Sequence, residues 1–206
     1  MTDFDFLISE FQDSALPSLT PREIELPRVS RKATVVIGVR RAGKTFLLYQ
    51  EIPRLLESGV DRRDILYANF KDDRLQPATP DLLARFLETF CRFNPAARRR
   101  TAYLFLDEIQ MIPGWPRFVR RVLDTENVRM YLTGSSAKML HADVATELRG
   151  RGLAVEVFRF SFSESNAAAG VESPAVMPPG PKLRSEIGRR LLTYLDVGGF
   201  PEVQTL

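Results

Sequence analysis

The fold is decided by one stretch, Gly38-Val39-Arg40-Arg41-Ala42-Gly43-Lys44-Thr45. Its order, a glycine, four intervening residues and then Gly-Lys-Thr, is the pattern of a loop that wraps around phosphate groups. Glycine lets the backbone curl so that several N–H groups point inward, and a following helix adds the positive end of its dipole. We therefore predict that residues 38–45 bind the phosphates of a nucleotide.

Individual positions in this loop have different expected roles. Lys44 brings a mobile positive charge to the β- and γ-phosphates, and the hydroxyl of Thr45 is a ligand for Mg²⁺. Arg40 and Arg41 either shield phosphate charge, contact a partner or, as is more common for the middle of such a loop, point away from the nucleotide.

The residues on either side of the loop provide the context that such a site needs. Ala33–Ile37 is a β-branched run typical of a strand buried on both faces. An amphipathic helix is expected from Gly43 to Gly59, with a kink or restart at Pro53 because proline lacks an N–H group. This context favours a phosphate site over an ordinary glycine turn.

Strands and helices alternate over the rest of the central region. Strands are expected at 65–70, 102–106, 128–132 and 153–160, and helices at 81–93, 116–123, 137–148 and 183–195. Such alternation indicates an α/β protein with a five-stranded parallel sheet and helices on both faces. Near the start, Phe4, Leu7, Ile8 and Phe11 follow helical spacing.

Two carboxylates follow the apolar strand at 102–106. Asp107 and Glu108 would lie at the carboxyl end of that strand, where parallel sheets place their ligand sites. Asp107 is expected to hold the hydration shell of Mg²⁺, and Glu108 to orient the attacking water or accept its proton. The alternative, an exposed acidic turn, loses weight because a phosphate loop precedes the pair.

The next strand ends in a polar cluster, Thr133-Gly134-Ser135-Ser136. Ser135 and Ser136 are candidates for sensing the γ-phosphate or the attacking water. They are equally good candidates for capping the helix that follows, because a serine hydroxyl binds free backbone N–H groups at a helix start.

Two arginines flank a glycine just before the last strand. Arg149 and Arg151 suit contact with a γ-phosphate, either in the same chain or in a neighbouring subunit, and Arg151 is the stronger candidate. The alternative is a surface loop with solvated charges.

Composition narrows the class of protein. The net charge is only +3, from 29 basic and 26 acidic residues, and does not by itself indicate a nucleic-acid-binding protein. A single cysteine excludes an internal disulfide. The start has neither a basic leader nor a long apolar stretch, and the apolar runs are too short to cross a bilayer. A cytoplasmic protein without a membrane anchor is the expectation.

Several motifs together carry a resemblance. The chain resembles a family of prokaryotic AAA-type ATPases through four motifs in the same order, Gly38–Thr45, Leu106–Gln110, Thr133–Ser136 and Leu148–Arg151. Trp115, the segment Asn69–Leu75 and the closing Gly198-Gly199-Phe200-Pro201 are also similar to that family.

The resemblance implies an additional-strand P-loop fold, in which the Thr-Gly-Ser-Ser strand separates the phosphate-loop strand from the Asp-Glu strand. It also implies ATP as the nucleotide, with Lys44, Thr45, Asp107 and Glu108 in the roles given above. Family members carry a C-terminal domain of uncharacterised function, whereas this chain stops at Leu206. We expect a fragment or a shortened form.

The expected organisation has four parts: an N-terminal extension at 1–30, a P-loop ATPase domain at 31–165, a loose linker at 166–182, and a helix at 183–206 that begins a C-terminal region. The predicted function is Mg²⁺-dependent ATP hydrolysis by in-line attack of water, which drives a conformational change in an attached domain or a client protein. A homo-oligomer is an open alternative.

Two rival functions stay in view. One is a regulatory module that senses nucleotide and turns it over negligibly. The other is a helicase-like ATPase stimulated by nucleic acid, suggested by Asp107-Glu108-Ile109-Gln110 and the arginine clusters. A helicase of that sort needs a second domain of the same type, which this length does not accommodate.

Overall fold

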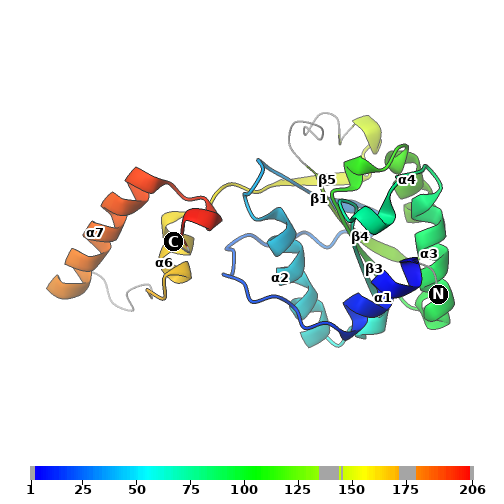
Figure 1. Cartoon of the computed structure of the whole chain (residues 1–206), viewed down its shortest axis with the longest axis horizontal. Coiled ribbons are helices and arrows are strands. Elements are labelled where there is room, and N and C mark those ends of the chain that lie inside the picture. The colour runs from blue at the N-terminus through cyan, green and yellow to red at the C-terminus, as the bar shows by residue number, and fades with distance from the viewer. Residues whose placement is uncertain (1–2, 135–143, 145, 172–179, 205–206) are drawn as a thin grey trace.

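The computed structural model describes residues 3–134, 144, 146–171 and 180–204. Its centre is a five-stranded sheet in the order β2-β3-β4-β1-β5, with every neighbouring pair parallel (Figure 1). The strands are β1 Ala33–Ile37, β2 Ile65–Asn69, β3 Ala102–Asp107, β4 Val128–Thr133 and β5 Gly152–Glu156. The predicted position of β4 between β1 and β3 is confirmed.

Helices cover both faces of the sheet, as predicted. The helices are α1 Asp3–Asp13, α2 Lys44–Glu57, α3 Leu82–Phe93, α4 Trp115–Thr125, α6 Phe162–Ala168 and α7 Pro181–Val197. Short 3-10 turns lie at Arg62–Asp64, Asp73–Leu75, Pro95–Arg98, Ile109–Met111 and Pro201–Gln204. The α2 helix runs through Pro53 as one element, without the expected restart.

The core has two layers because the central strands carry apolar side chains on both faces. One layer packs α1, α3 and α4 against the sheet, through residues such as Ile8, Phe86 and Val119. The other packs α2 against the opposite face, through residues such as Leu48 and Ile52. All five residues of β1 are buried, so the strand that leads into the phosphate loop is anchored from both sides.

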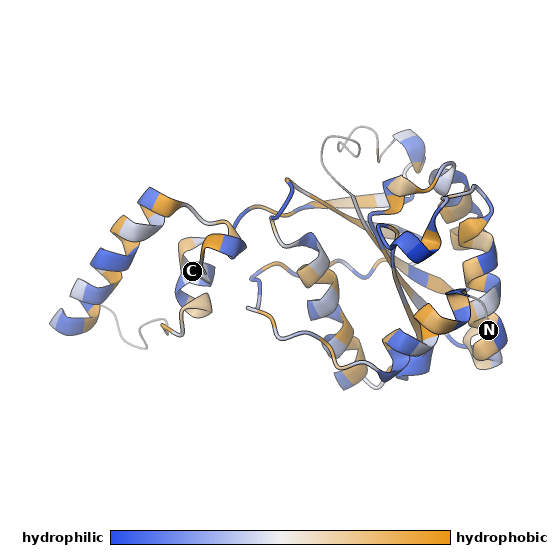
Figure 2. Ribbon diagram, in the orientation of Figure 1, coloured by the Kyte–Doolittle hydropathy of each residue, from blue (hydrophilic) through white to orange (hydrophobic). Residues whose placement is uncertain are grey.

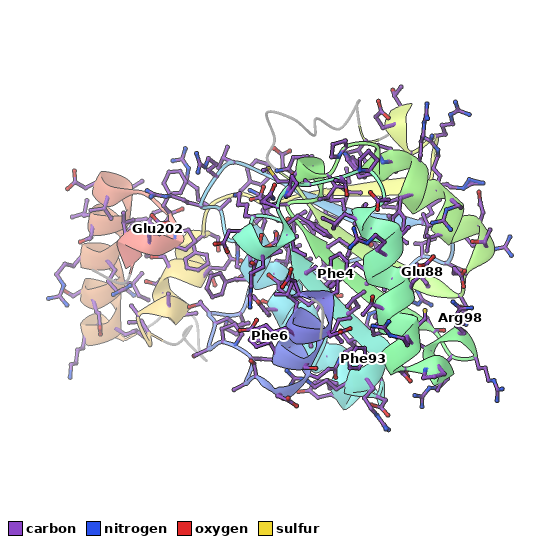
Figure 3. All side chains as sticks on the ribbon, turned by 45° about the vertical axis from the view of Figure 1, so that its right-hand side comes forward. Phe4, Phe6, Glu88, Phe93, Arg98 and Glu202 are labelled. Atoms are coloured by element: carbon purple, nitrogen blue, oxygen red, sulfur yellow. The ribbon has the colours of Figure 1, made fainter. Side chains whose placement is uncertain are left out.

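The N-terminal segment is part of this core. Phe4, Ile8 and Phe11 are buried, and the ring of Phe4 makes an edge contact with Phe86 of α3 at a centroid distance of 5.5 Å. Phe6, on the same helix, is 46% exposed (Figure 3). Residues of the expected N-terminal extension, 1–30, therefore contribute side chains to the core of the sheet domain.

The last two helices stand to one side of the sheet (Figure 1). The α6 helix begins before the expected linker and ends inside it, because Ser161 and Glu164 form a capping box at its start. The α7 helix has no buried residue, and hydrophobic residues are interspersed with polar ones along it (Figure 2). The middle of the expected linker, 172–179, lies outside the described residues.

Candidate nucleotide and magnesium site

The phosphate loop, Asp107 and Glu108 meet at one edge of the sheet. The strands β1, β4 and β3 are neighbours and parallel, so their carboxyl ends lie side by side. The phosphate loop follows β1, Thr133 ends β4, and Asp107 ends β3. This is the edge at which parallel α/β sheets bind their ligands.

The loop has the conformation that its glycines permit. Gly38 has φ +154°, and a Cβ atom there would lie 2.3 Å from the carbonyl oxygen of Val157. Gly43 has φ +91°, which is a left-handed conformation at the start of α2. Both positions therefore need glycine, one for its close approach to the backbone and one for its φ.

The intervening side chains mostly face solvent, in agreement with the expectation for the middle of the loop. Val39, Arg40 and Arg41 are exposed, whereas Ala42 is buried. Arg41 has φ +64° and forms an exposed ion pair with Glu202 at 3.2 Å.

Lys44 lies within the curl of the loop. Its Nζ atom donates hydrogen bonds to the carbonyl oxygens of Gly38 at 3.0 Å and Val39 at 2.9 Å. Burial lowers the pKa of Lys44, although the carboxylates of Glu108 and Asp107 oppose this shift. A partly desolvated ammonium group at this place is well suited to a phosphate, because its charge is weakly screened.

Thr45 and Asp107 contact each other directly. The Thr45 hydroxyl donates to Oδ2 of Asp107 at 2.8 Å, and the Tyr67 hydroxyl donates to the same atom at 3.3 Å. The Asp107 side chain is fully buried, and burial raises its pKa. Such a pair of hard oxygen donors fits Mg²⁺, which binds nucleotide sites through few protein oxygens and completes its shell with phosphate and water.

Glu108 lies beside this pair in a left-handed conformation, with φ 57°. Its carboxylate accepts hydrogen bonds from Nζ of Lys71 at 2.6 Å and from the amide of Gln110. Burial by itself raises the pKa of Glu108, but the bonds from Lys71 and Gln110 lower it below its usual value. A non-glycine residue in this conformation is uncommon, and such residues cluster at functional sites.

Thr133 connects the two strands that carry the site. Its hydroxyl donates to Asp107 and accepts the backbone N–H of Glu108 at 2.9 Å. The buried threonine therefore sets the position of both acidic residues. Ser135 and Ser136, the predicted sensors in the same cluster, lie outside the described residues.

Arg151, the second of the two arginines before β5, lies at the opposite end of β1 from the loop of its own chain. The backbone carbonyl oxygen of Arg151 accepts a hydrogen bond from the backbone N–H of Ala33, at the beginning of β1. The Arg151 side chain forms an ion pair with Asp124 at 2.8 Å. The length of β1, about 16 Å at 3.3 Å per residue, separates this position from the loop. The backbone of Arg151 therefore lies away from the phosphate loop of its own chain, because β5 runs parallel to β1 and begins at the opposite edge. Arg149 instead lines a cavity with Gln110, the partner of Glu108. Contact with a γ-phosphate, in the same chain or in a neighbouring subunit, stays a prediction for both arginines.

An apolar cavity of about 330 Å³ adjoins the loop on its other side. Leu19, Gly43, Phe46, Phe160 and Pro201 contribute to its lining. Of these residues, only Gly43 has a role that its sequence context predicts. The one pattern in the sequence that includes a lining residue is the closing Gly-Gly-Phe-Pro motif, and its position beside the phosphate loop is evident only from the fold.

The sheet order and the phosphate loop define this protein as a P-loop NTPase of the additional-strand type. Residues 30–166 match the family model described as AAA domain, which is more than half of the chain. The chain belongs to this AAA family, and it is an ATP-binding module of that type.

Curated relatives include an uncharacterised protein of Methanocaldococcus jannaschii, 34% identical over 88% of this chain and 38% of the relative. An uncharacterised protein of Haemophilus influenzae is 32% identical over 82% of this chain and 39% of the relative. The chain thus spans about two fifths of the length of these relatives. Among solved structures, C. elegans PCH-2 aligns with a TM-score of 0.44 and 15% identity, over 77% of this chain and 40% of that one.

None of the helices in the described ranges combines the length and the apolar character that a bilayer crossing requires.

Proposed function

We propose that this module hydrolyses ATP with Mg²⁺, by in-line attack of water on the γ-phosphate. The observation that carries this proposal is the arrangement of Lys44, Thr45, Asp107 and Glu108 at one sheet edge. The backbone amides of residues 38–45 and the Lys44 ammonium bind the phosphates. Glu108, the partly exposed carboxylate beside the Asp107–Thr45 pair, would face the attacking water once its ion pair with Lys71 opens.

Magnesium would be held by the Thr45 hydroxyl and, through water, by Asp107. When bound, it supplies positive charge that neutralises the phosphate oxygens. The hydroxyls of Thr133 and Tyr67 orient the Asp107 carboxylate for this task.

The apolar cavity next to Gly43 is the candidate for the adenine base. Phe46 is 50% exposed at this cavity, and a planar apolar ring would cover it. The base would then lie between the N-terminal segment, the first turn of α2 and the segment around Pro201.

The test is ATP turnover by the purified chain, compared with Glu108→Gln. We expect the variant to bind Mg·ATP with wild-type affinity and to lose about 10²-fold or more in kcat, because a general base contributes on that order. Lys44→Ala provides the blank for contaminating activity. Equal turnover by the wild type and Glu108→Gln would contradict the proposal, because Glu108 would then not be the general base.

A second candidate function is a nucleotide sensor with negligible turnover. The specific observation in its favour is the engagement of the Glu108 carboxylate by Lys71 and Gln110, which keeps it from an attacking water. Under this alternative, Lys71→Ala would not raise turnover above the blank. Under the hydrolytic proposal, nucleotide binding releases Glu108 from Lys71, and the client or attached region receives the resulting movement.

A further inference from the structure

Arg22 is a buried arginine in a segment that the fold places between the phosphate loop and the last helices. Its side chain is 3% exposed. The backbone around it is fastened to α2, because Gln50 accepts the Arg22 N–H at 2.6 Å and donates to its carbonyl oxygen at 3.0 Å. An arginine held so firmly has a guanidinium whose direction is set by the fold.

One side of the guanidinium faces the phosphate loop. Its Nη1 atom donates to the carbonyl oxygen of Ala42 at 2.9 Å, and the same atom lies 3.3 Å from where a Cβ of Gly43 would be. In a loop whose N–H groups turn inward to phosphate, the carbonyl groups turn outward and need partners. Arg22 supplies that partner for Ala42, directly before the glycine and the lysine.

The other side of the guanidinium faces α6. Nε donates to Oε1 of Glu164 at 2.7 Å, in an ion pair whose side chains are 3% and 4% exposed. Nη2 donates to the carbonyl oxygens of Phe158 at 2.9 Å and Arg159 at 3.4 Å, in the segment that leads into α6. The donors of Arg22 are thus directed at protein acceptors, on the loop and around α6.

Glu164 is fixed as firmly as its partner. The same carboxylate accepts the backbone N–H of Glu23 at 3.0 Å and that of Ser161 at 2.8 Å, the second bond being part of the α6 capping box. A movement of Ala42 that pulls on Arg22 therefore acts on the first turn of α6.

The α6 helix is in turn joined to α7. Nε of Arg190 donates to Oδ1 of Asn166 at 2.7 Å, and the Tyr194 hydroxyl donates to the carbonyl oxygen of Phe160 at 2.7 Å. The Phe162 and Tyr194 rings meet at a centroid distance of 5.6 Å. The contacts are continuous from the phosphate loop to the far helix.

We propose that Arg22 is a positioning residue that couples occupancy of the phosphate loop to the placement of α6 and α7. The inference rests on the proposed nucleotide binding at residues 38–45. Arg22 holds the Ala42 carbonyl in the orientation that leaves the loop amides free for phosphate. Because the same guanidinium binds Glu164, nucleotide binding and docking of α6 stabilise each other, and the coupling is reciprocal.

The experiment uses the full 206-residue chain and Mg·ADP as the probe, with calorimetry for affinity and hydrogen exchange for α6. In the wild type, we expect Mg·ADP to slow amide exchange in residues 162–168. The double variant Arg22→Met/Glu164→Leu replaces the buried ion pair by apolar groups of similar volume, so that neither charge is left buried and unpaired. We expect its Kd for Mg·ADP to rise about tenfold or more, because a charged hydrogen bond to the loop is lost.

Two further variants separate coupling from mere packing. Glu164→Gln keeps the shape of α6 and removes its charge, so the nucleotide-dependent slowing of exchange in α6 should shrink. Arg22→Lys keeps a positive charge for Glu164 but cannot also reach Ala42, so it should weaken Mg·ADP binding even if the double variant fails to fold. Arg92→Ala is the matched control, since its ion pair with Asp5 at 2.7 Å joins α3 to α1 without touching the loop.

The outcomes distinguish the two proposals. Folded Arg22 variants that bind Mg·ADP as the wild type does would overturn the coupling and leave the proposed function intact. If Arg92→Ala raised the Kd for Mg·ADP, relative to the wild type, as much as the Arg22 variants do, the coupling would also be overturned. The loss of affinity would then follow from lower stability alone. A wild type that binds no Mg·ADP would overturn both.

Discussion

Three hydroxyl groups from three different elements converge on the carboxylate of Asp107. Thr45 comes from α2, Tyr67 from β2 and Thr133 from β4. Such a buried carboxylate needs a partner for each oxygen: Thr133 is the donor to Oδ1, whereas Thr45 and Tyr67 share Oδ2. The loop glycines are a second effect at the residue scale, because Gly38 lets the backbone approach the Val157 carbonyl oxygen more closely than a side chain would permit.

At the residue scale, Gly38→Ala should lower stability by about 1–3 kcal/mol, because its Cβ would collide with the Val157 carbonyl oxygen. It should also weaken Mg·ADP binding, since the loop must shift to relieve the contact. Gly59→Ala is the control, because Gly59 also has a positive φ but no atom within 4 Å of its Cβ position. Chemical denaturation and calorimetry measure both effects, and equal behaviour of the two variants would refute the steric argument.

At the scale of elements, α1 completes the layer formed by α3 and the sheet. Its apolar side is buried against that layer, and Arg92 of α3 pairs with Asp5 across the contact. The helix therefore contributes to the same cooperative core as the strands, although it precedes them by some twenty residues of irregular chain.

We expect Phe4→Ala to cost about 3–5 kcal/mol of unfolding free energy, because it empties a space beside Phe86. Phe6→Ala is its matched control on the same helix, with a ring that is 46% exposed (Figure 3). Urea denaturation of both variants tests the difference. If Phe4→Ala were as stable as Phe6→Ala, α1 would be an appendage, which is the sequence-based prediction for residues 1–30.

At the scale of the whole molecule, a single buried ion pair joins regions that are far apart in the chain. Burial alone raises the pKa of Glu164, but Arg22 and two backbone N–H groups lower it below 4.5. The folded state therefore binds the proton more weakly than the unfolded chain does. The ion pair stabilises the fold above about pH 4.5, and this contribution is lost as the pH falls through the lower folded pKa.

The difference in Tm between the wild type and Glu164→Gln should consequently be constant from neutral pH to about pH 5 and shrink below it. Glu10→Gln is the control, because the Arg74–Glu10 pair is exposed and contributes little at any pH. A Tm difference for Glu164→Gln that persists unchanged at low pH would contradict the assigned role of its charge.

Arg149 and Arg151 are candidates to contact the nucleotide of a neighbouring subunit in an oligomer. Arg151 lies at the opposite edge of the sheet from the phosphate loop of its own chain, so its contact with phosphate requires a neighbouring subunit. If the site is shared in this way, specific ATPase activity rises with protein concentration, and Arg149→Ala or Arg151→Ala lowers it by about tenfold or more. If the specific activity depended neither on protein concentration nor on either substitution, these arginines would be solvated surface charges without a role in hydrolysis.

Much of the site was predictable from local patterns. The phosphate loop and the Asp107–Glu108 pair are read from consecutive residues, and each follows a strand whose β-branched or apolar composition marks it. The Arg22–Glu164 pair joins residues 142 positions apart, and neither has a neighbour in sequence that signals the contact. Lys71 lies in a segment that resembles the family, but its bond to Glu108 exists only because β2 and β3 are adjacent.

By itself, the sequence determined the elements and the chemistry at their ends, because hydrophobic periodicity and glycine placement act over a few residues. It also placed Lys44, Thr45, Asp107 and Glu108 after strands that had to be parallel. Only the tertiary structure decided which side chains from distant parts of the sequence contact each other. It placed Arg151 at the sheet edge opposite the phosphate loop and packed α1 into the core. It also placed Arg22 between the phosphate loop and α6. Those outcomes depend on strand order and packing, which no local pattern encodes.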